Sequence, residues 1–313
     1  MEGEMKILIF GAGYNGRICK EYIENNEQDV LAGFLDNAEE KPSISDKNGQ
    51  DIPVYSPDAI AGLEYDLIII SNINPSQIRE IQQQLRELNV PESKVQVLFE
   101  NKDLLTRVMR GSSQYDEAAD SRVSWLRNYA QYVNEKHLPG NVAECGVWMG
   151  DFARFINKYF PDKTLYLFDT FTGFDSRDLE KERNLGDADF LSGAFNDNQH
   201  FSAVVPYEHV VLAKMIYPER CVLKKGYFPD TAEGLEDQFC FVNLDMDLYQ
   251  PMLEGLRFFY ERMCDGGVIL LHDYFHPELP GVRRAVADFE RERQEALCKV
   301  PIGDFCSIAV IRY

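Results

Sequence analysis

Two short segments in the middle of the chain constrain its fold more than any other part. The first, Asn141 to Gly150, has an apolar strand pattern that ends in Glu144 and continues into a turn with Gly146 and Gly150. Glycine lets a turn pass close under a ligand because it has no β-carbon. The apolar spacing of Phe152 to Tyr159 then predicts a helix. Strand, glycine turn and helix in this order are typical of a sheet that binds a nucleoside.

The second segment is a strand that we predict over Thr164 to Phe168, and it ends in Asp169. In a doubly wound sheet, an acidic residue at the tip of the second strand binds a ribose diol, because one carboxylate can accept hydrogen bonds from both hydroxyls. We therefore expect Asp169 to bind the ribose of a nucleoside cofactor.

The strands predicted from residue 141 onward describe one domain, which we place at residues 121–313. Five parallel strands and a closing antiparallel pair are predicted at 141–144, 164–168, 221–224, 239–244, 267–271, 299–302 and 307–312. A helix over Ser121 to Glu135 is expected to cover this domain. The insert from Asp175 to Pro218 is too long for a plain connection, so we expect it to form a binding lid.

From residue 120 onward the chain resembles the macrocin-type sugar O-methyltransferases. Five segments carry the resemblance in the same order: Ala143–Val147, Leu167–Phe174, Lys225–Thr231, Val242–Tyr249 and Gly266–Tyr274. Five ordered matches are far more specific than any one of them. The resemblance implies an α/β fold with the Rossmann-like sheet of class I methyltransferases that depend on S-adenosylmethionine (SAM). It also implies an O-methyltransferase that acts on a hydroxyl of a sugar or of a glycosylated small molecule.

The residues expected to bind SAM lie at strand ends and in the turns that follow them. They are Glu144, Gly146, Gly150, Asp169, Thr170, Phe171 and Gly226. We expect Glu144 and Gly146 to border the methionine part of SAM and Asp169 to bind its ribose. In the resembled family, the segment that contains Gly226 borders the cleft for cofactor and substrate.

Asp245 and Asp247 at the end of the fourth strand, with Asp273 at the end of the fifth, put three carboxyl groups on one rim of the sheet. Such oxygen ligands suit Mg²⁺, and a bound dication would stabilise the alkoxide that forms from a sugar hydroxyl. The related enzymes usually have two adjacent acids where this chain has His272 and Asp273. We expect Asp245, His272 and Asp273 to be both catalytic residues and metal ligands. Asp247 either belongs to the rim or caps the helix that begins near Gln250.

His272 leaves further alternatives open. An imidazole can favour another divalent metal, such as manganese, or it can serve as the base of a metal-free reaction. Its presence also leaves open a non-catalytic binding protein that kept the sheet and lost the chemistry.

The first hundred residues predict a smaller Rossmann-like βαβ domain, which we place at residues 1–104 and follow with a linker at 105–120. Gly11, Gly13 and Gly16 come after its first strand and before a helix, and Asp36 ends the next strand. This context indicates a second nucleotide site, with a pyrophosphate at the helix amino terminus and a ribose at Asp36.

The ligand of this smaller domain has three alternatives. Similar half-size domains precede sugar acyltransferases, and this resemblance implies a nucleotide or nucleotide-linked sugar. The glycine motif alone is also compatible with NAD(P), which makes an NAD(P)-dependent oxidoreductase the main rival to methyl transfer. A purely structural or dimer-forming domain is the third alternative.

The net charge and the composition of the chain exclude some classes of binding partner. The formal net charge of −20 and the pI near 4.7 argue against nucleic acid and against an anionic membrane, so we expect a small-molecule substrate. The seven cysteines lack metal-site spacing and the density of a secreted disulfide scaffold, which indicates reduced thiols. No apolar run approaches the ~20 residues of a membrane-spanning helix, and we expect a cytoplasmic protein. A homo-oligomer is left open.

Overall fold

A computed structural model describes residues 4–26, 28–111, 120–185 and 206–313. These residues form two compact units. The first contains the described residues up to 111 together with 206–213, and the second contains 120–185 and the chain from Lys214 onward.

The described part of the first unit contains a five-stranded parallel sheet in the order β3-β2-β1-β4-β5. Its strands are β1 (Met5–Phe10), β2 (Asp29–Leu35), β3 (Val54–Tyr55), β4 (Leu67–Ile70) and β5 (Val95–Val97). Its helices are α1 (Tyr14–Asn25), α2 (Pro75–Glu87), α3 (Lys102–Gly111) and most of α7 (Tyr207–Lys214). Leu8 and Phe10 of β1 pack with Ile78 and Leu85 of α2 in one core cluster. The predicted Rossmann-like unit is therefore formed.

Helix α3 occupies residues that we expected to belong to a linker. Leu104, Leu105, Val108 and Met109 are buried, and α3 contacts α1. Apolar residues at this spacing lie on one face of a helix, so the segment packs on its unit although many of its other residues are polar. Residues 112–119 of the predicted linker lie outside the described residues, and its last residue, Asp120, is the N-cap of α4 (Ser121–Lys136).

The described part of the second unit contains a seven-stranded sheet in the order β11-β12-β10-β9-β6-β7-β8. Its strands are β6 (Asn141–Cys145), β7 (Leu165–Asp169), β8 (Cys221–Lys225), β9 (Phe239–Leu244), β10 (Met263–Leu271), β11 (Cys298–Pro301) and β12 (Ile308–Ile311). Its helices are α4 (Ser121–Lys136), α5 (Ala153–Tyr159), α6 (Ser176–Leu185), α8 (Tyr249–Phe259) and α9 (Pro280–Arg293). Strands β6 to β10 pair in parallel, and β12 pairs antiparallel with β10 and β11. The predicted five parallel strands and closing antiparallel pair are confirmed.

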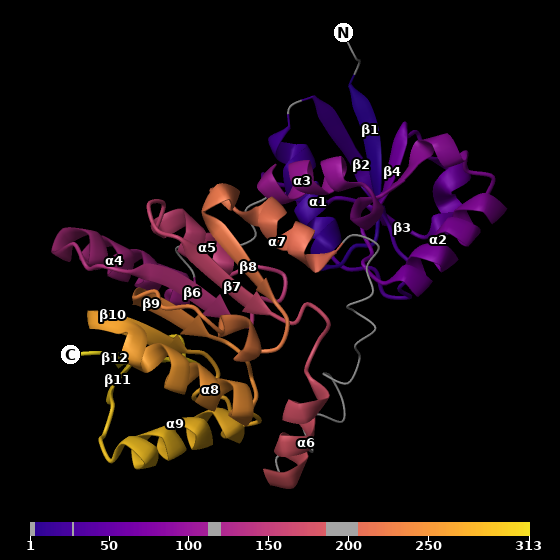
Figure 1. The fold of residues 1–313 in the computed structure, drawn as a ribbon. Coiled ribbons are helices and arrows are strands. Elements are labelled where there is room, and N and C mark those ends of the chain that lie inside the picture. The colour runs from indigo at the N-terminus through magenta and orange to yellow at the C-terminus, as the bar shows by residue number, and fades with distance from the viewer. Residues whose placement is uncertain (1–3, 27, 112–119, 186–205) are drawn as a thin grey trace. The chain divides into compact units, whose positions relative to one another are not determined.

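Helices cover both faces of this second sheet. The ring of Phe241 in β9 lies 5.9 Å from the ring of Tyr129 in α4, whereas Leu244 in the same strand packs with Leu256 of α8. Successive side chains of a strand point to opposite faces, so α4 and α5 lie on one face and α8 and α9 on the other (Figure 1). Strand β9 is buried along its whole length.

The helix predicted to cover this domain lies flat against the sheet. The hydroxyl of Tyr129 in α4 donates to the carbonyls of Cys240 and Gly266, both at 2.9 Å. These bonds hold the middle of α4 on the sheet, and its first turn reaches the carboxyl edge of the strands. The insert predicted as a lid contains α6 and α7, and its residues 186–205 lie outside the described residues, so the lid stays a prediction.

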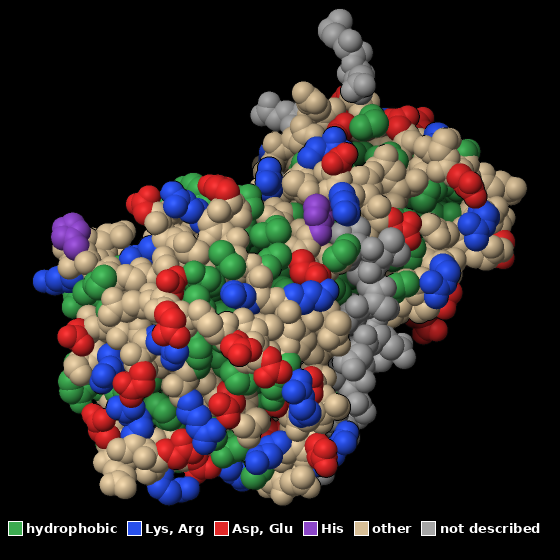
Figure 2. Space-filling view, in the orientation of Figure 1, with side chains coloured by type: hydrophobic (Ala, Val, Ile, Leu, Met, Phe, Trp, Pro, Cys, Tyr) green, Lys and Arg blue, Asp and Glu red, His purple; other side chains and the backbone are tan. Residues whose placement is uncertain are grey.

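The surface shown in Figure 2 carries Lys and Arg side chains interspersed with Asp and Glu. The seven cysteines are free thiols. Among the described residues, no helix combines the length and the apolar character needed to cross a bilayer.

Candidate functional site

The turn after β6 and the residue after β9 lie back to back at the carboxyl edge of the second sheet. Asp245 donates its backbone N–H to the carbonyl of Cys145 at 2.8 Å. Gly146 has a φ of +83°, and a β-carbon there would lie 1.8 Å from the carbonyl oxygen of Asp245. Gly150, which closes the turn, has a φ of +78°. The predicted glycine turn therefore lies against a residue that we expected to be catalytic.

Asp169 at the end of β7 holds this turn in place. Its Oδ2 accepts the N–H groups of Val147 and Trp148, both at 2.8 Å, and its Oδ1 accepts that of Phe171 at 2.7 Å. Burial raises the pKa of this carboxyl, and the three backbone donors oppose that shift. A ribose hydroxyl would have to share the Asp169 oxygens with these amides, and the ribose contact stays a prediction.

The other residues predicted to bind SAM border the same edge. Thr170 donates through Oγ1 to the carbonyl of Gly173 at 2.6 Å. The side chain of Phe171 is buried, and its backbone has a φ of +54°. Gly226 has a φ of +136° and donates its N–H to the carbonyl of Asp169 at 2.9 Å, which joins the ends of β7 and β8.

Glu144 is buried inside the sheet, beneath the glycine turn. Its Oε1 accepts from Nδ2 of Asn243 on the neighbouring strand at 2.9 Å, and its Oε2 has no hydrogen-bond partner among the described residues. Burial raises the pKa of Glu144 to about 8, against the opposing charge of Arg122. The carboxyl is therefore largely protonated at neutral pH, and a cationic ligand group nearby would favour its ionised form.

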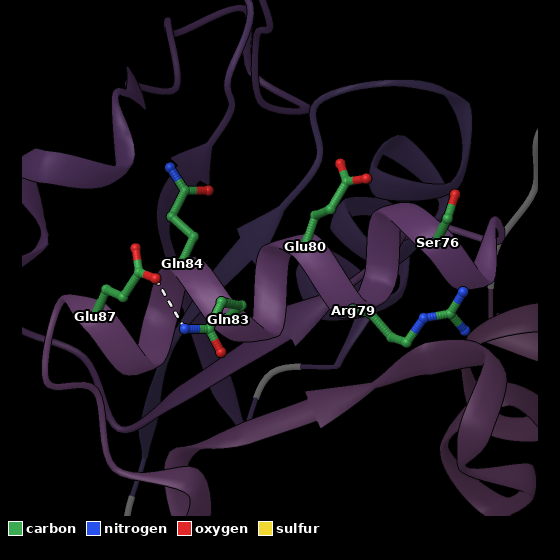
Figure 3. Close-up of a pocket in the computed structure, with 6 residues that line it drawn as sticks. All are labelled: Ser76, Arg79, Glu80, Gln83, Gln84 and Glu87. Atoms are coloured by element: carbon green, nitrogen blue, oxygen red, sulfur yellow. Dashed lines mark hydrogen bonds between the residues drawn. The ribbon is translucent and has the colours of Figure 1, made fainter.

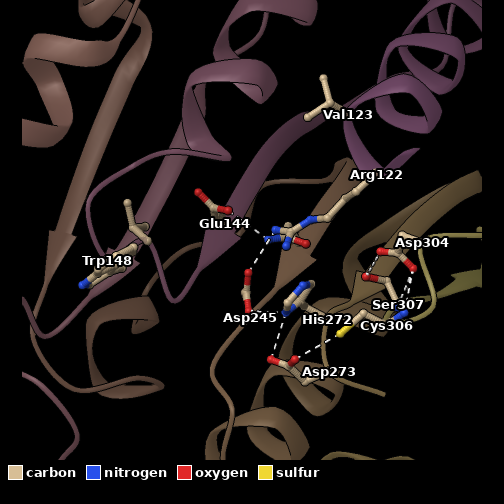
Figure 4. A network of polar contacts seen from close by, with 12 residues as sticks. Arg122, Val123, Glu144, Trp148, Asp245, His272, Asp273, Asp304, Cys306 and Ser307 are labelled. Carbon is tan, nitrogen blue, oxygen red and sulfur yellow. Dashed lines mark hydrogen bonds and ion pairs between the residues drawn. The ribbon is translucent and has the colours of Figure 1, made fainter. Parts of the chain in front are cut away.

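Asp245, His272 and Asp273 meet where β9 and β10 end. Nδ1 of His272 lies 3.0 Å from Oδ1 of Asp245 and 2.9 Å from Oδ2 of Asp273. Arg122, in the first turn of α4, donates through Nη2 to Oδ2 of Asp245 at 3.0 Å. Cys306, between β11 and β12, donates through Sγ to Oδ1 of Asp273 at 3.2 Å (Figure 4). The three predicted catalytic residues are thus brought together, and two further residues join them.

The charges of this cluster stabilise one another. Burial acts to raise the pKa of Asp245, but Arg122 and His272 outweigh it and lower that pKa to about 2. Burial acts to lower the pKa of His272, but the carboxylates of Asp245 and Asp273 raise it to about 10. Burial also acts to raise the pKa of Asp273, and the hydrogen bond with His272 makes the net shift downward. At neutral pH, these pKa shifts favour an imidazolium at His272 between the carboxylates of Asp245 and Asp273.

Asp247 lies beside this cluster, and its pKa shifts in the opposite direction to those of Asp245 and Asp273. Burial, followed by the charges of the neighbouring carboxylates, raises the pKa of Asp247 well above its ordinary value. Of the two alternatives for Asp247, the helix cap is wrong, because Leu248 occupies the N-cap position of α8 and the helix has no side-chain cap hydrogen bond. Instead, Oε1 of Glu182 accepts the N–H of Tyr249 at 2.9 Å.

The predicted metal ligands do not fit a divalent ion as they are arranged. Two sets of candidate ligand atoms lie within 4.8 Å of one another, one from Asp245, Asp247 and Asp273 and one from His272, Asp273 and Cys306. However, all four carboxylate oxygens of Asp245 and Asp273 already face donors of the chain itself. Mg²⁺ needs near-octahedral oxygen ligands at about 2.0–2.1 Å. The oxygens would have to turn away from their present donors to provide them.

The four residues of the predicted second nucleotide site lie together in the first unit. Oδ2 of Asp36 accepts the N–H of Ala12 at 2.7 Å. A β-carbon at Gly16 would lie 1.9 Å from the carbonyl oxygen of Gly11, whereas Gly13 faces open space. The turn from Gly11 to Gly16 is therefore closely packed at Gly16, as the glycine motif predicts. The nucleotide ligand of this turn stays a prediction.

Comparison with known proteins identifies the family of the second unit. Residues 112–306, which include the whole cluster around Asp245, match the family model of macrocin-O-methyltransferase (TylF). The chain belongs to the macrocin-O-methyltransferase family. This confirms the resemblance seen in the sequence. Residues 3–96 match a second family model, the C2185-like N-terminal domain.

Individual relatives of this macrocin-O-methyltransferase family member are distant. A curated protein of Streptomyces olivaceus, 8-demethyl-8-(2,3-dimethoxy-alpha-L-rhamnosyl)-tetracenomycin-C 4'-O-methyltransferase, is 25% identical over 183 residues, which cover 54% of this chain and 64% of that protein. The match thus spans less than two thirds of the relative. The O-methyltransferase NovP has a TM-score of 0.53 and 20% identity over 67% of this chain and 97% of NovP. The calicheamicin methyltransferase CalS11 has a TM-score of 0.50 and 20% identity over 76% of this chain and 93% of CalS11. The shared fold is the class I methyltransferase sheet that we predicted.

Two residues that contact the cluster of Asp245, His272 and Asp273 were not found from the sequence, namely Arg122 and Cys306. Oδ1 of Asp120 accepts the N–H of Val123 at 3.0 Å and so caps α4. The helix predicted over Ser121 to Glu135 begins where α4 begins and so already placed Arg122 in its first turn. What the side chain of Arg122 meets depends on how α4 packs on the sheet, which no local pattern records.

A separate hollow of about 480 Å³ lies along α2 in the first unit (Figure 3). It is lined by Ser76, Arg79, Glu80, Gln83, Gln84 and Glu87. All six residues belong to one helix, and none is a predicted site residue. We assign no ligand to this hollow.

Proposed function

We propose that the chain transfers the methyl group of SAM to a hydroxyl of a sugar or of a glycosylated small molecule. One observation carries the proposal: within the segment that matches the macrocin-O-methyltransferase family, the glycine turn held by Asp169 lies against the cluster of Asp245 and His272. A place for the cofactor and a place for proton transfer thus share one sheet edge. This arrangement favours methyl transfer over an NAD(P)-dependent reaction centred on the first unit.

For SAM we propose the residues at the ends of β6, β7 and β8, namely Glu144, Gly146, Gly150, Asp169, Thr170, Phe171 and Gly226. The glycines allow the backbone to approach the ligand, and Asp169 has lone pairs left for a ribose hydroxyl. Glu144 supports the placement of a cationic group, because its Oε2 is buried without a hydrogen-bond partner in the described residues.

The acceptor hydroxyl needs a base, because its proton is nearly as reluctant to leave as that of water, whose pKa is about 15.7. When bound, SAM supplies a methyl group on a sulfonium sulfur, so the acceptor oxygen gains the methyl group as the carbon–sulfur bond breaks. Nδ1 of His272 is held between two carboxylates, which leaves Nε2 to accept the hydroxyl proton when the ring is neutral. The lowered pKa of Asp245, about 2, makes that residue a weak base. We therefore assign proton acceptance to His272 and orientation of its ring to Asp245 and Asp273.

The name of the relative from Streptomyces olivaceus describes an O-methyltransferase that acts on a rhamnosyl tetracenomycin. This supports a sugar hydroxyl as the class of acceptor. For the first unit we propose a nucleotide-linked sugar at Gly11, Gly13, Gly16 and Asp36, where the helix amino terminus follows a tightly packed turn. A role of the same unit in forming a homo-oligomer is the alternative.

The test is transfer of a labelled methyl group. The purified chain would be incubated with methyl-labelled SAM and a panel of nucleotide-linked sugars and glycosylated small molecules. We expect the label in an acceptor of one of these classes, in an ether that resists mild base, with equimolar S-adenosylhomocysteine. Binding of NADH together with failure to bind S-adenosylhomocysteine would contradict the proposal.

A further inference from the structure

Side chains of the chain itself provide donors to Asp245 and Asp273, and the third carboxyl of this acidic cluster, Asp247, contacts Asp273. Asp245 accepts from Arg122 on one oxygen and faces Nδ1 of His272 on the other, both at 3.0 Å. Asp273 faces the same ring nitrogen at 2.9 Å and accepts from Cys306 at 3.2 Å. All four carboxylate oxygens of Asp245 and Asp273 therefore contact a donor group, and the two that face His272 share its single Nδ1–H.

The guanidinium of Arg122 is fixed in this position. It lies 3.7 Å from the ring centroid of Phe152, and the Arg122 side chain is only 13% exposed. A guanidinium stays protonated throughout the pH range of proteins, and partial burial reduces its screening by solvent. Arg122 thus supplies a permanent positive charge beside Asp245.

A divalent ion at the same carboxylates would compete with both donors. The ion would need the oxygen atoms that Arg122 and His272 now contact, and the guanidinium would repel it at short range. Arg122 and His272 neutralise the charge of the carboxylates and hold them in one geometry, as a bound metal ion would do.

We infer that Arg122 and His272 take the place of a divalent ion in this site, so that methyl transfer by this chain needs no added metal. This role rests on the proposed function. In the transfer, the acceptor hydroxyl gives its proton to Nε2 of His272, and its oxygen forms the new bond to the methyl carbon. The electron pair of the broken carbon–sulfur bond stays on sulfur. Arg122 acts through Asp245 and is a positioning residue.

Metal binding can be measured without any acceptor. The chain would be stripped with a chelator and titrated with Mn²⁺, with free Mn²⁺ followed by electron paramagnetic resonance. We expect His272→Asp, which creates two adjacent acids, to bind Mn²⁺ at least tenfold more tightly than the unchanged chain. Arg122→Gln should also bind more tightly because it frees an oxygen of Asp245, whereas Arg122→Lys keeps the charge and should stay weak. Arg127→Gln is the matched control, since Arg127 is exposed on the same helix. Mn²⁺ binding by the unchanged chain as tight as that of His272→Asp would overturn the inference.

Activity provides the second readout. With an acceptor from the labelled-methyl assay, we expect the rate to change less than twofold between excess chelator and added Mg²⁺. Arg122→Gln should lower kcat with little change in KM for SAM, and Arg122→Lys should recover part of the loss. A more than tenfold fall with chelator that Mg²⁺ restores would overturn the inference. If no acceptor is methylated, the proposed function fails, and the Mn²⁺ titration still decides the question of the metal.

Discussion

Nδ1 of His272 lies 3.0 Å from Oδ1 of Asp245, so a candidate base and an acid that orients it come from neighbouring strand ends. Strands β9 and β10 pair in parallel, and their carboxyl ends bring both residues to one edge of the sheet. A carboxylate that holds one ring nitrogen fixes the tautomer and leaves the other nitrogen for proton transfer. The function of the site therefore depends on the protonation state of His272.

The first prediction concerns the pH dependence of activity. The pKa of His272 is raised to about 10, and the ring must be neutral to accept a proton, so kcat/KM should rise with pH towards about 10. Burial, which lowers this pKa, is outweighed by the carboxylates of Asp245 and Asp273, while Arg122 also lowers it, and Asp247 and Asp304 interact with the ring as well. In the complex, the positive sulfonium should move the rising limb of kcat to lower pH than that of kcat/KM. Initial rates from pH 6 to 10.5 would check this, and His272→Gln should lose the limb. An unchanged limb in that variant would assign the titration to another group.

The second prediction separates chemistry from cofactor binding. Asp245→Asn keeps the shape of the side chain and removes the charge that orients His272 and pairs with Arg122. We expect turnover to fall by about 10²- to 10⁴-fold, the range for loss of acid–base catalysis, while S-adenosylhomocysteine binds almost as before. Steady-state kinetics and calorimetry measure the two effects. Full activity in this variant would remove Asp245 from the mechanism.

The third prediction concerns the cofactor turn. Asp169→Asn weakens the acceptor of the Val147 and Trp148 N–H groups and of a ribose hydroxyl. Hydrogen bonds to charged groups contribute about 1.5–3 kcal/mol, so calorimetry should show a loss of this size in affinity for S-adenosylhomocysteine, with a lower Tm. Asp265→Asn, at an exposed position in β10, serves as control. Unchanged affinity together with a lower Tm would limit Asp169 to holding the turn.

The fourth prediction tests the contact between the two halves of the site. Gly146→Ala places a methyl group against the carbonyl oxygen of Asp245, whereas Gly234→Ala, at a similar φ of +74°, meets nothing within 4 Å. Both variants carry the cost of a left-handed backbone, about 1–3 kcal/mol, and only the first also displaces Asp245. We expect a larger loss of Tm and of activity for Gly146→Ala. Equal losses in denaturant unfolding would mean that the turn can move away without cost.

Much of the second unit could be predicted from the sequence because its signals are local. Apolar runs marked the strands, Gly146 marked a close backbone approach, and Asp169 and Asp245 stood at strand ends, where parallel strands share one edge. Hydrophobic patterning fixes which residues enter a sheet, and the sheet then fixes which strand ends are neighbours.

The remaining features depend on packing between distant segments. Arg122 reaches Asp245 across 123 positions of the chain, and Cys306 reaches Asp273 across 33. Contacts between residues so far apart along the chain produce no periodic pattern in the sequence. Helix α3 differs, because the spacing of Leu104, Leu105 and Val108 is a local signal that the polar composition of the surrounding segment outweighed in our interpretation.

A crystal structure of the chain with S-adenosylhomocysteine bound tests the central claim most directly. We expect the ribose at Asp169 and the sulfur at the sheet edge that carries Asp245 and His272. Density for the ligand only at the Gly11 to Gly16 turn of the first unit, or an unoccupied edge at saturating ligand, would contradict methyl transfer at this site.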